Sequence, residues 1–240
     1  MSPNIVTSKN NCWIIATDKY QGEIDSQWFD DGYWLNQGRL LGASSGRGSA
    51  WMIKSEQEKM MLRHYYRGGI PAKFNKDKYL WTGINKTRSF SEYKLLEKMV
   101  ALKLPVPEPI AAQVCKLGLF YQANIIIQYI IHDNTFAEIL NQESNENTWK
   151  EIGQTIALFH NNGIYHADLN ANNILITQEQ IYLIDFDHSK QCKRKKMWQN
   201  ANMKRLKRSI DKLTDDKHIE ANNRKWNSLE KAYHQAIKRP

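Results

Sequence analysis

Apolar residues recur at helical spacing near the middle of the chain, between residues 89 and 104. One face of a helix over this segment would carry Leu95, Met99 and Leu102. Ser89 and Glu92, three positions apart, have the spacing of a capping box at its start. Prolines follow at positions 105, 107 and 109, and proline cannot continue a helix. We therefore predict a helix from Ser89 to Leu104.

A second segment has the same periodicity and ends at a glycine. Its apolar stripe consists of Trp149, Ile152, Ile156 and Phe159. Thr148 and Glu151 have the capping-box spacing at the start, and Gly163 stands where a C-terminal cap belongs. The pattern predicts a helix that begins near Thr148 and ends just before Gly163.

Short apolar runs bounded by turn residues predict strands elsewhere. These runs are residues 50–53, 60–66, 124–131, 174–177 and 181–184. Residues 1–40 are interpreted as short strands and loops, and everything beyond Asp187 as helical. Strands, a helix, more strands and then helices are typical of an α+β chain. We expect a β-rich part over residues 1–128 and a mainly helical part over residues 129–240.

Composition excludes several classes of protein. Of the 240 residues 41% are hydrophobic, which excludes wholesale disorder, and no stretch approaches the ~18 apolar residues of a membrane span. Residues 1–11 are polar, so no signal peptide is expected. The chain has three widely spaced cysteines, Cys12, Cys115 and Cys192. This odd number and wide spacing argue against a disulfide framework or a zinc site and suit a reducing cytoplasm.

The net charge of +9 comes from one segment, residues 189–210, which holds nine Lys or Arg and no Asp or Glu. Such a block indicates a polyanionic partner or, alternatively, a solvated charge run.

An apolar stripe of Met203, Leu206, Ile210 and Leu213 runs through this basic segment. The segment is either an amphipathic helix on an anionic surface or a helix packed on the C-terminal part with its charges in solvent. We expect a packed helix whose cations face a membrane or the phosphates of an acceptor: Lys204, Arg205, Lys207 and Arg208. Nucleic acid is not expected, because no aromatic-interleaved RNA-binding motif accompanies the block.

The segment Tyr165–Asn173 carries the clearest chemistry. Asp168 and Asn173 lie in this loop between a predicted helix and a strand, and Asp185 follows twelve residues after Asn173. Phosphoryl transfer from ATP needs a carboxylate near the acceptor hydroxyl and oxygen ligands for Mg²⁺. We assign Asp168 as the catalytic base and Asn173 and Asp185 as metal ligands. His166 is expected to orient the loop.

These motifs resemble the protein-kinase-like superfamily and, more closely, the 3-deoxy-D-manno-octulosonic acid (Kdo) kinases among the lipopolysaccharide core kinases. The resemblance is carried by residues 62–69, 166–170 and 184–187 and covers most of residues 35–215. It implies a bilobal fold with a β-rich N-lobe and a mainly helical C-lobe. It also implies ATP-dependent phosphorylation of the Kdo 4-hydroxyl on a lipid A precursor, by a peripheral protein at the cytoplasmic face of a bacterial inner membrane.

Two alternatives stay open. One is a kinase-like enzyme that acts on another small molecule or a protein, and the other is a catalytically dead binding module. Asn170 stands where protein kinases acting on Ser or Thr carry lysine, which argues against a standard protein kinase. The intact Asp168, Asn173 and Asp185 argue against a dead module.

The nucleotide side follows from the same resemblance. Gly42, Gly46 and Gly48 resemble a glycine-rich loop over phosphates, although an ordinary hairpin has similar glycines. Glu92 resembles the helix carboxylate that pairs with a phosphate-binding cation, unless it only completes the capping box. That cation is Arg63 by position, with Lys73 as the alternative. The segment resembling an adenine-binding hinge is Gln128, Tyr129 and Ile130.

Overall fold

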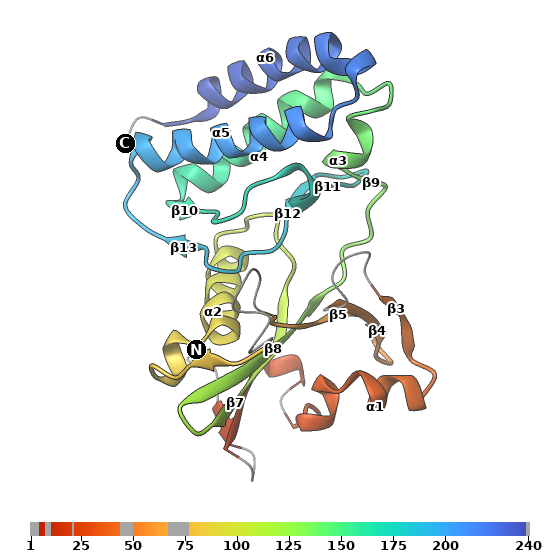
Figure 1. Cartoon of the computed structure of the whole chain (residues 1–240), viewed down its shortest axis with the longest axis vertical. Helices are drawn as coiled ribbons and strands as arrows, with labels where there is room; N and C mark the ends of the chain where they lie inside the picture. Colours follow the sequence, from red (N-terminus) through yellow and green to blue (C-terminus); the bar gives the residue numbers. More distant parts are fainter. Residues whose placement is uncertain (1–4, 8–10, 21, 44–49, 67–76, 239–240) are drawn as a thin grey trace. The chain divides into compact units, whose positions relative to one another are not determined.

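The computed structural model describes residues 5–7, 11–20, 22–43, 50–66 and 77–238. The chain divides into two units (Figure 1). The first comprises Met1–Glu97 and Pro107–Ile130, and the second comprises Lys98–Val106 and Ile131–Pro240. Among the described residues, no helix is long and apolar enough to cross a membrane.

The described strands of the first unit form an eight-stranded antiparallel sheet. Its order is β1-β2-β7-β8-β5-β4-β3, with β6 paired to β8. The strands are β1 (Ile5–Thr7), β2 (Cys12–Ala16), β3 (Leu40–Ala43), β4 (Ala50–Lys54), β5 (Lys59–His64), β6 (Tyr79–Leu80), β7 (Pro109–Leu117) and β8 (Phe120–Gln128). The predicted strands at 50–53, 60–66 and 124–131 are confirmed as β4, β5 and β8, with shifted ends.

Helices of the first unit are mostly short. They are η1 (Asp18–Tyr20), η2 (Ser26–Phe29), α1 (Asp31–Asn36), η4 (Ile84–Lys86) and α2 (Arg88–Ala101). The end of α2, from Lys98 on, groups with the second unit. Alternate residues of the strands and the aromatic residues of η1, η2 and α1 share one core, in which Tyr20, Trp34 and Met60 are buried. Buried residues between Ile14 and Trp34 therefore belong to this unit's core.

Strand β7 is absent from the sequence prediction, and it changes the interpretation of the cysteines. Pro109 begins this strand, so it does more than stop a helix. The register of β2 against β7 places Cys12 opposite Cys115, and the two form a disulfide. The expectation against a disulfide is therefore wrong for this pair, and Cys192 is a free cysteine. The cysteine count no longer supports a reducing compartment.

The predicted helix at 89–104 is α2, but its predicted cap is wrong. The helix begins at Arg88 and ends at Ala101. Ser89 is fully buried, and its hydroxyl donates to the carbonyl of Gln113 in β7. Glu92 points to strand β5 instead of closing a capping box. Because the helix begins at Arg88, Ser89 lies inside it, and the two side chains contact strands of the sheet instead of capping the helix.

The second unit is mainly helical (Figure 1). Its helices are α3 (Phe136–Ile139), α4 (Glu146–Asn161), η5 (Ala171–Asn173), α5 (Lys196–Leu213), η6 (Asp216–His218) and α6 (Ile219–Ala236). Its short strands are β9 (Asn134–Thr135), β10 (Ile164–Tyr165), β11 (Ile174–Ile176), β12 (Ile181–Leu183) and β13 (Lys190–Gln191). The antiparallel pair β11–β12 confirms the two predicted β runs. Strand β13, paired with β10, corrects the expectation that everything beyond Asp187 is helical.

Helix α4 confirms the predicted stripe, because Trp149, Ile152, Ile156 and Phe159 are all buried. The cap predicted at Thr148 is wrong, since the helix begins earlier and the side chain of Asn145 accepts from the Asn147 N–H. A complete capping box occurs instead at Thr135 and Glu138 of α3.

Gly163 follows the C-cap of α4 with a φ of 72°, as its position in the sequence predicted. A Cβ atom there would lie 2.5 Å from the carbonyl oxygen of Cys192. Because glycine has no Cβ, the chain can turn from α4 into β10 while passing close to the backbone of Cys192, which follows β13.

The observed units differ from the expected division after residue 128 in two places. The first unit extends to Ile130, and Lys98–Val106 groups with the second unit. One reason is that the N–H of Leu183 in β12 donates to the carbonyl of Pro105. A contact between residues so far apart has no signature in local sequence patterns.

Candidate active site

The loop after β10 is closed by a circuit of hydrogen bonds around His166. The N–H of Asp168 donates to His166 Nδ1 (3.1 Å), and His166 Nε2 donates to the carbonyl of Ile184 (3.0 Å). Because Nδ1 accepts from a backbone N–H, it carries no proton, and Nε2 is the donor. Burial lowers the pKa of His166, which favours this neutral form. His166 therefore ties the loop of Asp168 to the segment that precedes Asp185.

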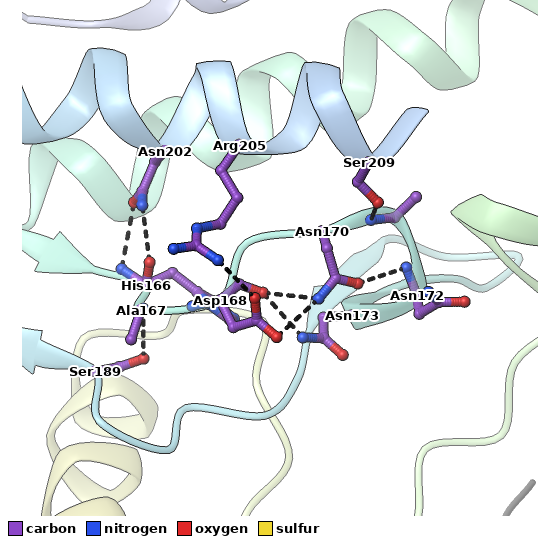
Figure 2. Close-up of polar contacts among 11 residues, drawn as sticks. His166, Ala167, Asp168, Asn170, Asn172, Asn173, Ser189, Asn202, Arg205 and Ser209 are labelled. Carbon is purple, nitrogen blue, oxygen red and sulfur yellow. Dashed lines mark hydrogen bonds and ion pairs between the residues drawn. The ribbon is translucent and has the colours of Figure 1, made fainter. Parts of the chain in front are cut away.

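Asn173 completes the circuit. Its Nδ2 donates to the backbone carbonyl of Asp168 (3.0 Å), and its own carbonyl accepts from the N–H of Ile184 (3.0 Å). Because the amide nitrogen is held inside the loop, the amide oxygen is directed away from it (Figure 2). That oxygen is a suitable ligand for a hard cation such as Mg²⁺.

Asp185 stands in the left-handed region, with a φ of 62°. Asp and Asn adopt this conformation more readily than most residues with a side chain, although it still stores strain. Phe186 next to it is buried and stacks on Phe159 of α4, with ring centroids 5.9 Å apart. Strained backbone conformations cluster at active sites and ligand-binding loops, and the packing of Phe186 anchors this one.

The carboxylate of Asp168 is more than half exposed and has two partners in the second unit. Oδ1 accepts from Arg205 Nη1 of α5 (3.0 Å), and Oδ2 accepts from Asn170 Nδ2 (3.1 Å). Asn170 also caps η5, since its Oδ1 accepts from the N–H of Asn172. The carboxylate is thus oriented and still open to a substrate hydroxyl.

Helix α5 holds the loop at three points, which Figure 2 shows. Asn202 bonds the N–H and carbonyl of His166, Arg205 pairs with Asp168, and Ser209 Oγ accepts from the N–H of Ala171. Asn202 and Ser209 are absent from the sequence assignment. Their spacing at i and i+7, beside the buried stripe of α5, is the signal that could have identified them.

In the first unit, Arg63 and Glu92 meet as the sequence assignment expected. Arg63 Nη2 lies 2.5 Å from Glu92 Oε2, and the hydroxyl of Tyr65 donates to the same oxygen. Burial, and then the adjacent Glu92 carboxylate, raise the pKa of Tyr65 well above its usual value. The sequence assignment missed Tyr65, whose position two residues after Arg63 on β5 was the available signal. Glu92 therefore orients a guanidinium, although it forms no capping box.

The other nucleotide-side candidates are placed only in part. Gly42 lies in β3, whereas Gly46, Gly48 and Lys73 lie outside the described residues. At the expected hinge, the N–H of Gln128 donates to Glu108 and that of Tyr129 to Lys59. Ile130 is buried.

The basic candidates on α5 separate into different environments. Lys204 and Arg208 are exposed, and Arg205 pairs with Asp168. Lys207 pairs with Asp211 and also donates to Asn223 of α6. The apolar residues Met203, Leu206 and Ile210 are buried, so the expected packed helix is confirmed.

Buried histidines behind the loop predict a pH dependence of stability. Burial lowers the pKa of His160 from 6.5 to about 4. Because the folded-state pKa is depressed, the neutral ring stabilises the fold fully above pH 6.5, and this contribution is lost as the pH falls toward 4. We expect the free energy of unfolding to fall by up to about 3 kcal/mol over that interval through this residue.

Urea titrations at several pH values measure the effect. A His160→Gln variant should lose less stability on acidification than the parent. A His234→Gln variant, changed at an exposed site on α6, should keep the parent's slope. Equal slopes in all three proteins would contradict the contribution of His160.

Two features define a kinase-like fold. The first unit is an antiparallel sheet in which a strand arginine pairs with a carboxylate from a helix. The second unit is helical and carries Asp168, Asn173 and Asp185 on loops joined by hydrogen bonds. The chain belongs to the lipopolysaccharide kinase (Kdo/WaaP) family, whose model matches residues 31–233.

Relatives and a solved structure agree with this family. The chain is 38% identical over 239 residues to a 3-deoxy-D-manno-octulosonic acid kinase of Haemophilus influenzae, covering 95% of this chain and 98% of that protein. It is 40% identical over 212 residues to a protein of the same name from Stenotrophomonas maltophilia, covering 88% and 85%. A structure of WaaP in complex with acyl carrier protein matches with a TM-score of 0.57 at 9% identity, covering 95% of this chain and 89% of that chain, and it supports the kinase-like fold.

Proposed function

We propose that this protein is an ATP-dependent kinase that phosphorylates the 4-hydroxyl of a Kdo sugar on a lipid A precursor. Family membership and relatives named Kdo kinases support the substrate class. The observation that carries the chemistry is the hydrogen-bond circuit through His166 and Asn173, which ties the Asp168 loop to the segment entering Asp185. Phosphoryl transfer depends chiefly on positioning and charge, and this circuit supplies positioning.

Asp168 acts as the base in this proposal. The acceptor hydroxyl approaches its exposed carboxylate and gives up its proton as the new bond from oxygen to the γ-phosphorus forms and the bond to ADP breaks. Arg205 and Asn170 keep the carboxylate oriented for that proton transfer. His166 and Asn173 prevent the loop from shifting, since each bonds the backbone of Asp168.

Asn173 and Asp185 fit a magnesium site. The donor set is one amide oxygen and one carboxylate, which suits an ion that also takes phosphate oxygens and water. Magnesium bound there would neutralise charge on the phosphates of ATP. These two side chains are the proposed protein ligands. In the first unit, we assign Arg63, oriented by Glu92 and Tyr65, to the phosphates of ATP.

The direct test is an acceptor panel with labelled ATP and purified protein. Kdo-lipid A precursor should become labelled, whereas an aminoglycoside and casein should not. An Asp168→Asn preparation made in parallel controls for contaminating kinases. Label in another acceptor and none in the Kdo lipid would overturn the proposal.

We also assign the exposed cations of α5 to an anionic surface, either the acceptor's phosphates or the cytoplasmic face of the inner membrane. The apolar stripe of α5 is buried in the protein, so attachment relies on charge. Charges screened over about 8 Å at physiological ionic strength give binding that salt reverses.

Charge reversal tests this assignment. Lys204→Glu combined with Arg208→Glu should raise KM for the lipid acceptor by up to about thirtyfold, since each cation contributes about 1 kcal/mol near an anionic surface. KM for ATP should stay unchanged. The matched control is Arg224→Glu with Lys231→Glu, two exposed positions on α6. An unchanged KM for the lipid would remove these cations from acceptor binding.

A further inference from the structure

The loop that carries Asp168 contains no cation of its own. Residues 166–173 include neither Lys nor Arg, and position 170 is asparagine. The cation beside Asp168 comes instead from α5, where Arg205 Nη1 lies 3.0 Å from Asp168 Oδ1 (Figure 2). Tertiary structure thus places a guanidinium at the point where an acceptor hydroxyl must arrive.

Arg205 has more hydrogen-bonding capacity than this contact uses. Among the described residues, its hydrogen bond is the one from Nη1 to Asp168. A guanidinium has five N–H donors in a planar fork. The side chain is 44% exposed, so its remaining donors are accessible to a substrate.

The proposed acceptor is itself an anion at this site. Kdo is a sugar acid, and its carboxyl group is ionised at neutral pH. When its hydroxyl approaches Asp168, the sugar carboxylate comes near the carboxylate of Asp168, and two like charges repel. A cation within reach of both groups removes that repulsion.

The distances allow one guanidinium to serve both carboxylates. A hydroxyl that gives its proton to Asp168 lies about 3 Å from the carboxylate. Since Arg205 contacts the same carboxylate, its guanidinium lies within about 6 Å of that hydroxyl. The carboxyl group of Kdo is a few bonds from the 4-hydroxyl on the same sugar. Lysine would offer a point charge here, whereas arginine offers the planar fork that suits carboxylates.

We propose that Arg205 binds the carboxylate of the acceptor sugar and thereby makes the site specific for a sugar acid. It keeps one N–H on Asp168 and uses the others for the acceptor. This role rests on the proposed function, and it assigns Arg205 a different task from that of the exposed cations Lys204 and Arg208.

The test compares an acidic acceptor with its neutral derivative. The substrates are Kdo-lipid A precursor and the same compound with its Kdo carboxyl groups converted to methyl esters. The parent enzyme should have a kcat/KM roughly 10- to 100-fold higher for the acid, as expected for hydrogen bonds to a charged group. Arg205→Gln should reduce this ratio to near one, mainly by raising KM for the acid. Arg205→Lys should retain an intermediate ratio, because it keeps charge and loses the fork.

The controls separate recognition from a structural effect. Arg224→Gln, at an exposed position on α6, should keep the parent's ratio. If Arg205→Gln lowers activity equally on acid and ester, Arg205 acts on Asp168 or on the transferred phosphoryl group, and the proposal is overturned. A parent enzyme that accepts both substrates equally would overturn it as well.

Binding distinguishes this proposal from the proposed function. Calorimetric titration of the parent and Arg205→Gln proteins with free Kdo and with its methyl ester measures the discrimination without turnover. Failure to phosphorylate any Kdo acceptor would refute the proposed function. The ratio of the two dissociation constants would still decide the role of Arg205. That role requires the parent protein to bind the acid more tightly than the ester, and Arg205→Gln to bind both about equally.

Discussion

Replacing Asp168 by alanine is expected to lower kcat roughly 10²- to 10⁴-fold, the range for loss of a general base. Asp168→Asn should have a similar effect, since the amide keeps the size of the side chain and loses its basicity. The dissociation constant for ATP should change little, because the proposed phosphate and metal contacts belong to other residues. Rapid-quench measurement of a single turnover, combined with equilibrium binding of ATP, separates the two quantities.

A neighbouring residue supplies the control for this prediction. Asn172 is exposed in the same turn, and its contact with Asn170 uses its backbone N–H. Asn172→Ala should therefore keep most of the parent's turnover and its melting temperature. Retained turnover in Asp168→Ala would remove Asp168 from the mechanism.

Asp185→Asn is expected to weaken magnesium-dependent ATP binding, so that the magnesium concentration required rises at least about tenfold, since loss of groups that merely support metal ligands already costs about 10- to 100-fold. Asparagine tolerates the left-handed conformation at this position, where φ is 62°, so the substitution removes charge without a new backbone strain. Titration of magnesium at fixed ATP, followed by activity and by binding, measures the shift.

A second residue in the left-handed region tests whether backbone conformation alone explains the effect. His188 has a φ of 58° and is not a proposed metal ligand. His188→Asn should leave the magnesium requirement unchanged. The metal role of Asp185 would be refuted by an Asp185→Asn protein that needs no more magnesium than the parent.

Sequence patterns were sufficient for the parts of this protein that depend on near neighbours. The apolar stripes of α4 and α5 appear in the printed sequence, because helical periodicity repeats within a few residues. The motifs with Asp168, Asn173 and Asp185 also lie within twenty residues of one another, in a loop and a hairpin whose geometry is local. Their spacing indicated phosphoryl transfer, and the resemblance of these motifs and of residues 62–69 to known kinases implied the family that the family model shows.

Helix ends were less predictable, because several residues compete for the same backbone N–H groups. Ser89 and Thr148 both have capping-box partners in the sequence, yet neither caps its helix. Ser89 bonds strand β7 instead, and Asn145 caps α4 from three residues upstream. The choice among candidate caps is made by what each side chain meets after packing.

Tertiary structure alone decided two long-range pairs. Arg205 meets Asp168 across 37 positions, and Cys12 meets Cys115 across 103. Each pair depends on the register in which two elements pack, and a register has no signature in the spacing of residues along one element. The sequence by itself therefore determined which residues could perform phosphoryl transfer. Packing decided which cation stands beside the catalytic carboxylate, because only the folded chain brings α5 against the loop after β10.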